Sequence, residues 1–538
     1  MGRKLGMVLS IGVLAALVSP AARAGSPPNG CSTGRAAIAY DAGGNPLRPQ
    51  PPGAPAPCLG ATGYATVETH LAVTGDGSLV YEPAIITPGL LGSSFVPGAP
   101  GPHPWSPVSP AGIAVSHDQA ATWQFVAPAG SLYASNDNAM YVDPATGRLF
   151  MAMLAPAFPS GGQLAPQDQP VLTHEIMLTS GDDGTSWAYE ALPAFVSSEN
   201  PRFAAAPPPA GGVRPAGGYP DVTYWCGNRE VGLVEPLILE RECYRSLDAG
   251  TSWEMRSILF TNPVPQHPEC GTSREDINSL DGEYPQGTSD GSLYLIVGCT
   301  PNTNPSGHDA VDYLARSTDE AATFPVLRGP GAKPVTLPVP ASPDYPELRV
   351  AGNTLVLVYS LTGAGGPRLV MRTAPIPGFT RAGALSTPLA WSPPVRLTPP
   401  GLLSLDRWAV EVRGNELAAS FIAGSRRPGS STTVYDGYLS VTPDVGNVRQ
   451  VWTGMVNDPS RPLSSSAPMS AKDDFIGIAI GPDGRPWASY FAPCSAEQSA
   501  STDPACQGSF VNGQPADSAF EGGEDRGLVG SLSFGRGR

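Results

Sequence analysis

The sequence carries little charge, and most of that charge is acidic. Only 15% of the 538 residues are Asp, Glu, Lys or Arg, and 47 acidic residues against 32 basic ones give a net charge of −15. No basic cluster offsets this balance, which disfavours nucleic acid and anionic membranes as partners. Beyond the N-terminus the sequence also lacks any run of about 18 uninterrupted apolar residues, so it predicts no membrane span.

Signatures of common cofactor and metal sites are missing as well. There is no phosphate-binding loop, no dinucleotide-binding fingerprint and no HExxH motif, and the eight cysteines lack the CxxC spacing of a zinc site. No cofactor is therefore certain. The cysteines instead fall in near pairs, which favours local disulfides although the sequence does not prove the connectivity. The expected pairs are Cys31 with Cys58, Cys226 with Cys243, Cys270 with Cys299, and Cys494 with Cys506.

The N-terminus has the pattern of a secretory signal peptide. Arg3 and Lys4 precede the apolar run "LGMVLSIGVLAALV", and Ala22-Arg23-Ala24 forms a small-x-small cleavage site. We therefore expect a signal peptide over residues 1–24, a Pro/Gly-rich segment over 25–60, and one folded body over 61–538. The location follows from this: a secreted protein, extracellular or periplasmic.

Glycine and proline are abundant, with 63 and 62 residues, while hydrophobic residues still make up 41%. The chain can thus bury a core and also supply many turns, which is typical of an all-β protein built from short strands.

One eight-residue pattern occurs four times. "SHDQAATW", "SGDDGTSW", "SLDAGTSW" and "STDEAATF" begin at intervals of 64 to 71 residues, the range of repeated supersecondary units. Ser and Asp can accept backbone N–H groups across a turn, Gly permits positive φ, and Trp packs on the sheet. We therefore assign these residues a structural role: Ser116, Asp118, Trp123, Ser180, Asp182, Gly184, Trp187, Ser246, Asp248, Gly250, Trp253, Ser317, Asp319 and Phe324.

A second period covers the whole body. Seven units each open on a polar residue and continue as strand, tight turn and strand, as in "LAVTGDGSLVY". Four strands fill each unit, and radial repetition of four-stranded sheets is a β-propeller. The predicted fold is one propeller of seven blades, with six or eight as alternatives and the Ser-x-Asp turns in the first four blades. A strand near Gly63 to Val67 would close the ring against the last blade.

The four turns resemble the Asp-box, or BNR, repeats of the sialidase superfamily of propellers, and counting degenerate copies the resemblance covers most of residues 60 to 535. It implies a site with an arginine triad, a tyrosine nucleophile with a glutamate partner, and an aspartate acid/base. The implied Arg-Ile-Pro motif is absent, and no Arg or Lys occurs from Pro49 to Gly147. The sequence therefore argues against exo-sialidase activity.

The residues that open the seven units are expected to converge on the mouth of the central channel. The third of these residues is Asn200, beside Glu199, and the other six are acidic. Together with neighbours, they form a predicted ring of acids: Glu68, Asp137, Asp281, Glu283, Asp344, Glu347, Asp406, Asp473 and Asp474. We predict that Glu68, Asp281 and Glu283 are catalytic and that the others bind substrate with His70, Arg202 and Arg407. Crowded carboxylates either stay protonated, pair with arginine or bind a divalent cation such as calcium. The structural alternative is that they only lock neighbouring blades together.

These features predict a monomeric, secreted, sialidase-like propeller that binds or hydrolyses extracellular glycans at an acidic channel mouth. The competing interpretation is a non-catalytic extracellular scaffold that binds a surface protein. Sequence alone does not decide between an enzyme and a binding protein.

Overall fold

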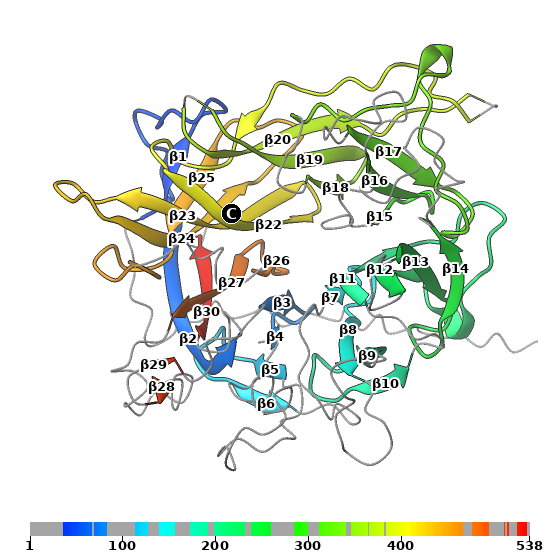
Figure 1. Ribbon diagram of the computed structural model, residues 1–538, viewed down its shortest axis with the longest axis horizontal. Helices are drawn as coiled ribbons and strands as arrows, with labels where there is room; N and C mark the ends of the chain where they lie inside the picture. The colour runs from blue at the N-terminus through cyan, green and yellow to red at the C-terminus, as the bar shows by residue number, and fades with distance from the viewer. Residues whose placement is uncertain are drawn as a thin grey trace, which may run out of the picture.

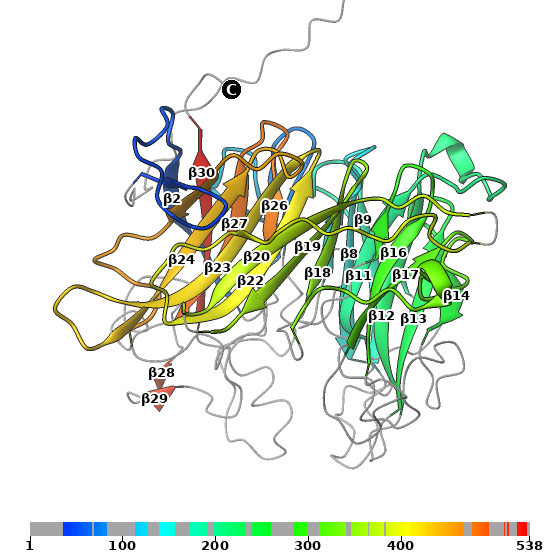
Figure 2. The ribbon, with the colours of Figure 1, turned by 90° about the horizontal axis from the view of Figure 1, so that it is seen from above.

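The computed structural model describes residues 36–66, 69–82, 113–126, 139–156, 173–191, 198–231, 238–259, 285–299, 311–340, 346–363, 365–380, 383–465, 476–493, 510–511, 514–515 and 525–534. Seven antiparallel sheets surround a central axis (Figure 1), and strands run through the thickness of the disc (Figure 2). Of the described residues, only the 3-10 turns η1 (Ala216–Gly218) and η3 (Pro330–Ala332) are helical. The predicted all-β, seven-bladed propeller is confirmed.

The first four blades follow one another in the chain. Blade 1 contains β3 (His70–Val73), β4 (Leu79–Glu82), β5 (Ile113–Ser116) and β6 (Gln124–Val126). Blade 2 contains β7 (Ala139–Val142), β8 (Leu149–Pro156), β9 (Thr173–Ser180) and β10 (Ala188–Ala191). Blade 3 contains β11 (Ser198–Ala206), β12 (Val222–Val231), β13 (Ile238–Ser246) and β14 (Glu254–Ile258). Blade 4 contains β15 (Gln286–Gly287), β16 (Leu293–Cys299) and β17 (Val311–Ser317).

The last three blades complete the ring. Blade 5 contains β18 (Glu347–Ala351), β19 (Thr354–Leu361), β20 (Arg368–Pro375) and β21 (Val395–Arg396). Blade 6 contains β22 (Ser404–Arg413), β23 (Glu416–Arg426), β24 (Thr433–Thr442) and β25 (Val451–Met455). Blade 7 contains β26 (Ile478–Ile480), β27 (Pro486–Pro493) and β30 (Asp525–Ser533), and a short hairpin joins β28 (Phe510–Val511) to β29 (Gln514–Pro515).

Two strands from the start of the chain join sheets from its end. β2 (Ala56–Thr66) pairs with β30 and becomes the outer strand of blade 7, so the ring closes between sequence-distant segments. This confirms the predicted closing strand, which is longer than Gly63 to Val67. β1 (Ile38–Tyr40) pairs with β25 and extends blade 6 to five strands.

The core lies between the blades. Alternate side chains of a strand point to opposite faces of the sheet. A strand whose blade packs against another blade on each face is therefore apolar at consecutive positions. In β19, Leu355 and Leu357 pack toward blade 4, whereas Val356 and Val358 pack toward blade 6. Because each middle strand is buried on both faces, removal of one blade would expose two apolar surfaces.

The four Ser-x-Asp turns share one hydrogen-bond network. In each turn the Ser hydroxyl donates to the Asp carboxylate over 2.8 to 2.9 Å. The N–H of the fifth residue donates to the Ser hydroxyl in the same four turns. The carboxylate also accepts the N–H of the residue four positions later, as Asp182 does from Ser186 over 2.9 Å. Each turn is thus stabilised by hydrogen bonds among its own residues. It connects the third strand of its blade to the residues that follow.

In blade 4 the segment after the turn forms no fourth strand. Ala315 and Val326 make an isolated bridge, and the N–H of Arg316 donates to the carbonyl of Pro325 over 3.1 Å. Pro325 has no N–H to continue the ladder on one side, and on the other side the N–H of Leu314 donates to the carbonyl of Val335 over 3.1 Å, so the pairing stays short.

The disulfide predicted between Cys226 and Cys243 is confirmed, and it joins the paired strands β12 and β13. Cys58 is also disulfide-bonded. Each of the other three predicted pairs includes at least one residue outside the described part of the chain. Within that part, no helix has the length and apolar character needed to cross a membrane.

Candidate functional site

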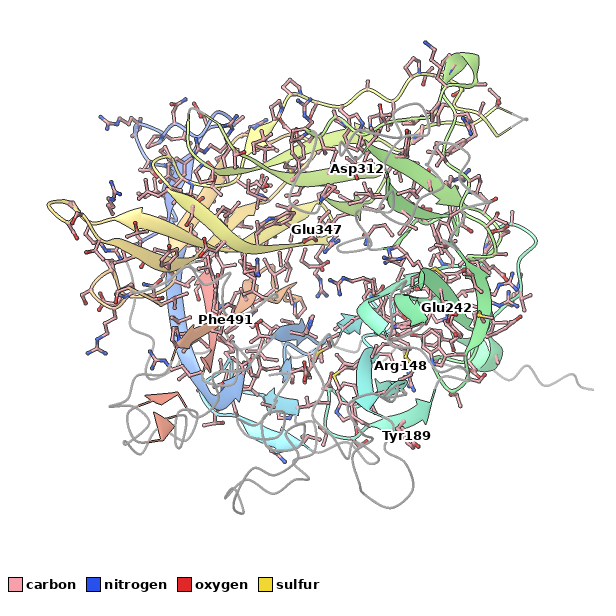
Figure 3. The ribbon with its side chains drawn as sticks, in the orientation of Figure 1. Arg148, Tyr189, Glu242, Asp312, Glu347 and Phe491 are labelled. Carbon is pink, nitrogen blue, oxygen red and sulfur yellow. A yellow bond between two sulfur atoms is a disulfide. The ribbon has the colours of Figure 1, made fainter. Side chains whose placement is uncertain are left out.

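A pocket of about 130 Å³ lies on the axis of the ring, and all seven blades contribute to it. The innermost strand of each blade supplies one or more of its walls. Its lining residues are His70, Leu71, Ala139, Met140, Tyr141, Arg202, Phe203, Gln286, Arg349, Ala409, Val410, Glu411, Ile476, Gly477 and Ile478. Glu347 lies next to this pocket at the inner edge of the ring (Figure 3). Polar and ionisable groups from distant parts of the chain are therefore gathered around one small space.

Glu347 and Arg349 lie two residues apart on β18, so their side chains share a face. The guanidinium of Arg349 donates to the Glu347 carboxylate over 2.5 Å. It also donates to the carbonyl of Val410 in blade 6 from Nε and Nη2, at 3.1 and 2.9 Å, and to the carbonyl of Leu348 at 3.0 Å. Arg349 therefore both pairs with Glu347 and ties blade 5 to blade 6.

Burial dominates the electrostatics of Glu347. Loss of hydration raises the pKa of this carboxyl to about 7, although the guanidinium groups of Arg349 and Arg202 act in the opposite direction. Glu411 reinforces the upward shift through its own negative charge. Near neutral pH, Glu347 therefore exists in both protonation states, which is what a residue that gives up and regains a proton requires.

His70 and Arg202 face the same pocket from blades 1 and 3. Burial, with the nearby positive charge of Arg202, lowers the pKa of the His70 imidazole to about 3. The ring is thus neutral throughout the physiological range and carries one N–H donor and one acceptor nitrogen. Arg202 is only 3% exposed and keeps a positive charge beside the pocket.

Glu411 and Tyr141 line the pocket from blades 6 and 2. Burial raises the pKa of Glu411, and Arg349 opposes this shift. One carboxylate oxygen of Glu411 accepts the N–H of Val412 over 3.0 Å. Burial, together with the negative charges of Asp143 and Glu411, raises the pKa of the Tyr141 phenol well above its usual value. Tyr141 is therefore a neutral hydroxyl at this site.

The structure brings together only part of the predicted site. His70 and Arg202 line the pocket, and Glu347 accepts a hydrogen bond from the lining residue Arg349. Asp406 and Arg407 lie earlier on β22, at a bulge between Leu405 and Arg407, while Ala409, Val410 and Glu411 supply the lining. The remaining predicted acids lie outside the described residues: Glu68, Asp137, Asp281, Glu283, Asp344, Asp473 and Asp474.

Four polar residues of the pocket were not among the sequence-based candidates: Tyr141, Gln286, Arg349 and Glu411. The two-residue alternation of side chains along a strand could have identified one of them from the sequence. Arg349 follows Glu347 by two positions, so a period of two from a predicted site residue would have identified it. The other three required knowledge of how far each inner strand extends along the axis.

Within the described part of the chain, no group of three or more His, Cys, Asp or Glu side chains is placed to hold a metal ion. A calcium-type site among the acids at the channel mouth remains a prediction, because most of those acids lie outside the described residues.

No family model and no curated protein matches the sequence, but solved structures resemble the fold. The GH93 α-L-arabinofuranosidase of Fusarium graminearum aligns at a TM-score of 0.38 and 12% identity, over 74% of this chain and 92% of that enzyme. The Penicillium chrysogenum α-L-arabinanase aligns at 0.30 and 14%, over 62% and 92%. The endosialidase of phage phi92 aligns at 0.35 and 9%, over 89% and 70%. Because these scores and identities are low, no activity or substrate is transferred from them to this chain.

Proposed function

We propose that this chain is a secreted propeller protein that binds an extracellular glycan at the central pocket and hydrolyses a glycosidic bond there. The observation that carries this proposal is a pair of carboxyls, the buried Glu347 and the half-buried Glu411, beside a pocket that also presents Arg202 and His70. Hydrolysis of glycosides needs one carboxyl that donates a proton and a second that acts as base or nucleophile.

Glu347 is the proposed proton donor. Its pKa of about 7 keeps a substantial protonated fraction at neutral pH, and protonation of the glycosidic oxygen turns that oxygen into a leaving group. When Glu347 gives up its proton, the new carboxylate is held by the guanidinium of Arg349 at 2.5 Å. Glu411, on the adjacent blade, is the proposed base that activates water. Arg202 and the neutral imidazole of His70 supply hydrogen bonds to sugar hydroxyl or carboxylate groups.

The four Ser-x-Asp turns belong to the same proposal. We assign them as Asp-box repeats on the basis of their spacing and shared hydrogen bonds. Export is supported by the N-terminal signal pattern and by the Cys226–Cys243 disulfide, since disulfides persist in oxidising compartments.

The test is a screen of the purified protein against glycosides and polysaccharides, with release of reducing ends as the readout and a chelator in parallel. We expect Glu347→Gln to lower turnover by about 10² to 10⁴-fold, as loss of a general acid does. Arg202→Met should weaken substrate binding. Glu254→Gln, which changes a carboxyl that is 57% exposed on an outer strand, is the matched control and should retain activity. Full turnover by Glu347→Gln would contradict its assigned role.

The acids outside the described residues are alternative catalytic candidates, and the same screen tests them. A Glu68→Gln, Asp281→Asn double variant tests the channel mouth directly. If this variant loses turnover while Glu347→Gln keeps it, hydrolysis takes place at the mouth and not beside Glu347.

One observation favours the non-catalytic scaffold as a second candidate. The donors of Arg349 go to Glu347 and to backbone carbonyls of blades 5 and 6, so this pair also locks the ring. If no glycan is cleaved or bound, and Glu347→Gln lowers the free energy of unfolding instead, the scaffold is the better description.

A further inference from the structure

A second and larger hollow lies away from the axis, between blades 2 and 3. It measures about 560 Å³ and is lined by Thr146, Arg148, Gly181, Ala216, Gly217, Gly218, Tyr219, Pro220, Asp248 and Ala249. Thr146 and Gly181 belong to turns that follow β7 and β9, whereas the central pocket takes His70, Ala139 and Gln286 from the first positions of inner strands. The two hollows share no lining residue, and we call the second one the blade 2–3 groove.

Tyr219 provides a fixed aromatic wall in this groove. Its hydroxyl donates to the carboxylate of Asp143, lies 3.0 Å from the hydroxyl of Thr146, and Thr146 in turn donates to Asp143 over 2.7 Å. The ring itself is half-buried and lines the groove. A ring that is held by its hydroxyl and lines a hollow can serve as a stacking surface, because its binding costs little side-chain entropy.

Arg148 supplies hydrogen-bond donors to the same groove. It projects from blade 2 on the side that faces blade 3 (Figure 3). One Nη donates to the hydroxyl of Thr179 over 3.0 Å, which fixes the plane of the guanidinium. A Cβ added at Gly181 would lie 3.3 Å from the other Nη, so the glycine leaves room for this side chain. The Nε of Arg148 is buried, so the donors that can reach a ligand are on its two Nη atoms, which carry more N–H groups than the Thr179 hydroxyl can accept.

Ala216 to Gly218 form an exposed glycine shelf that lines the groove. The N–H of Ala216 donates to the carbonyl of Leu247 over 2.6 Å, which anchors the shelf to blade 3. Gly217 and Gly218 both have positive φ, and a Cβ built on either would meet no atom within 4 Å. The space beside the Cα atoms of Gly217 and Gly218 is therefore open, which leaves room for a ligand to approach the backbone of this shelf.

Charge and size define the class of ligand. Arg148 is the only cation among the lining residues, while Asp248 lines the groove, Asp143 accepts the Tyr219 hydroxyl, and Asp221 lies next to Asp143. This surplus of acid disfavours an anion. One aromatic face, a planar cluster of donors and exposed peptide groups match a ligand with an apolar ring face and many hydroxyls. The volume lies within the range of about 300–1,000 Å³ typical of small-ligand sites.

We propose that the blade 2–3 groove binds neutral sugar residues of a glycan chain, with a sugar face stacked on Tyr219 and its hydroxyls bonded to Arg148 and to the peptide groups of the glycine shelf. This site binds without cleaving, and it does not depend on hydrolysis at the central pocket.

Calorimetric titration with neutral gluco-, xylo- and arabino-oligosaccharides, and with oligogalacturonates as acidic counterparts, tests the proposal. Tyr219→Ala should weaken binding of the neutral ligand about tenfold, which corresponds to about 1.4 kcal/mol of lost contact. Tyr219→Phe, which keeps the ring, should bind within about threefold of the parent protein. Ala216→Trp should block the groove from the exposed shelf without entering the core.

Arg202→Met and Glu347→Gln distinguish the two hollows, since neither residue lines the groove. Neutral-sugar binding that survives both changes and is lost in Tyr219→Ala and Ala216→Trp supports the groove. Binding that is lost only in the Arg202 or Glu347 variants places the ligand in the central pocket and overturns the groove. Unchanged binding in Tyr219→Ala, a preference for oligogalacturonates, or no neutral-sugar binding by the parent protein also overturns it.

Discussion

At the scale of single residues, buried carboxyls differ in how they are compensated. Glu347 has Arg349, and Asp436 accepts hydrogen bonds from Arg427 at 2.7 Å and from Asn457 at 2.9 Å. Asp312, in blade 4 (Figure 3), is 3% exposed, and none of the described residues donates a hydrogen bond to its Oδ2. Burial alone raises the pKa of Asp312 to about 6. Its ionisation is thus a cost to the fold, and burial is not offset by any charge of the described residues.

This cost should appear as a pH dependence of stability. The pKa of Asp312 is higher in the folded chain than in the unfolded chain. Its contribution to the stability of the fold is therefore fully present below pH 4 and is lost as the pH rises through 6. The loss by pH 8 is about 3 kcal/mol from the size of the shift. We therefore expect the free energy of unfolding of Asp312→Asn, relative to that of the parent protein, to be higher at pH 8 than at pH 5. Urea unfolding at the two pH values measures this difference.

The control is Asp458→Asn. The pKa of Asp458 is lowered, chiefly by the N–H of Ser460, so this carboxyl is ionised at both pH values. Its substitution should change the unfolding free energy equally at pH 5 and pH 8. The same equality for Asp312→Asn would show that Asp312 is not the group that titrates.

At the scale of elements, the Ser-x-Asp turns also seal the blades against one another. The fifth residue of each turn has positive φ, and it is Ala120, Gly184, Gly250 or Ala321. Gly250 of blade 3 packs on blade 2, where an added Cβ would lie 2.5 Å from Cγ2 of Thr179 and 2.8 Å from Cε1 of Phe150. The turn therefore requires a left-handed residue for its own geometry and, in blade 3, one without a side chain for the contact between blades.

Exchange of glycine and alanine at this position separates the two requirements. Gly250→Ala adds both left-handed strain and a collision with blade 2, and it should lower the free energy of unfolding by about 2–3 kcal/mol. Ala120→Gly removes strain but makes the unfolded chain more flexible, so its effect should stay within about 1 kcal/mol. Chemical denaturation of both variants checks this. If the two substitutions change the free energy of unfolding by the same amount, the contact of Gly250 with blade 2 contributes nothing to stability.

The turns and the blades could be predicted because their causes are local. Each Ser-x-Asp turn contains its own donors and acceptors within eight residues, and each blade shows alternating strands around a glycine turn. The site was harder, since its residues face the axis only after seven strands have been staggered against one another. Asp406 opens its unit in the sequence, yet a bulge beside it shifts the register, and Glu411 further along β22 lines the pocket. Arg349 and Glu411 belong to the site because of where neighbouring blades end, which no single segment encodes.

At the scale of the whole molecule, arginine side chains link one blade to the next. Arg349 of blade 5 donates to Val410 in blade 6, and Arg413 of blade 6 donates to Ile480 in blade 7. Arg485 of blade 7 donates to Gln119 in the first Ser-x-Asp turn over 2.8 Å and stacks on Trp487, with its Cζ 4.2 Å from the ring centroid. These links satisfy backbone and side-chain acceptors where blades meet, so the ring is held by polar contacts as well as by apolar packing.

The ring nevertheless depends on one joint. Blade 7 receives its outer strand from β2, which pairs with β30 from Ala56 opposite Ser533 to Thr66 opposite Asp525. A chain that begins after Thr66 would lack this strand and expose the edge of β30 as unpaired N–H and C=O groups. We expect such a chain to unfold at a temperature several degrees lower than the full chain and to associate in solution. Thermal unfolding with size-exclusion chromatography measures both effects.

A peptide of residues 51–66 with Cys58→Ser should restore the melting temperature when it is added to the shortened chain, because it can pair with β30 as β2 does. The same peptide with Leu59 and Gly60 replaced by proline should fail, since one of those two N–H groups must face β30 and proline has none. The shortened chain also lacks β1, and rescue by a peptide that contains only β2 would assign the loss to the joint in blade 7. If the shortened chain melts at the same temperature as the full chain, ring closure by β2 contributes nothing to stability, and the contacts between blades suffice to hold the propeller together.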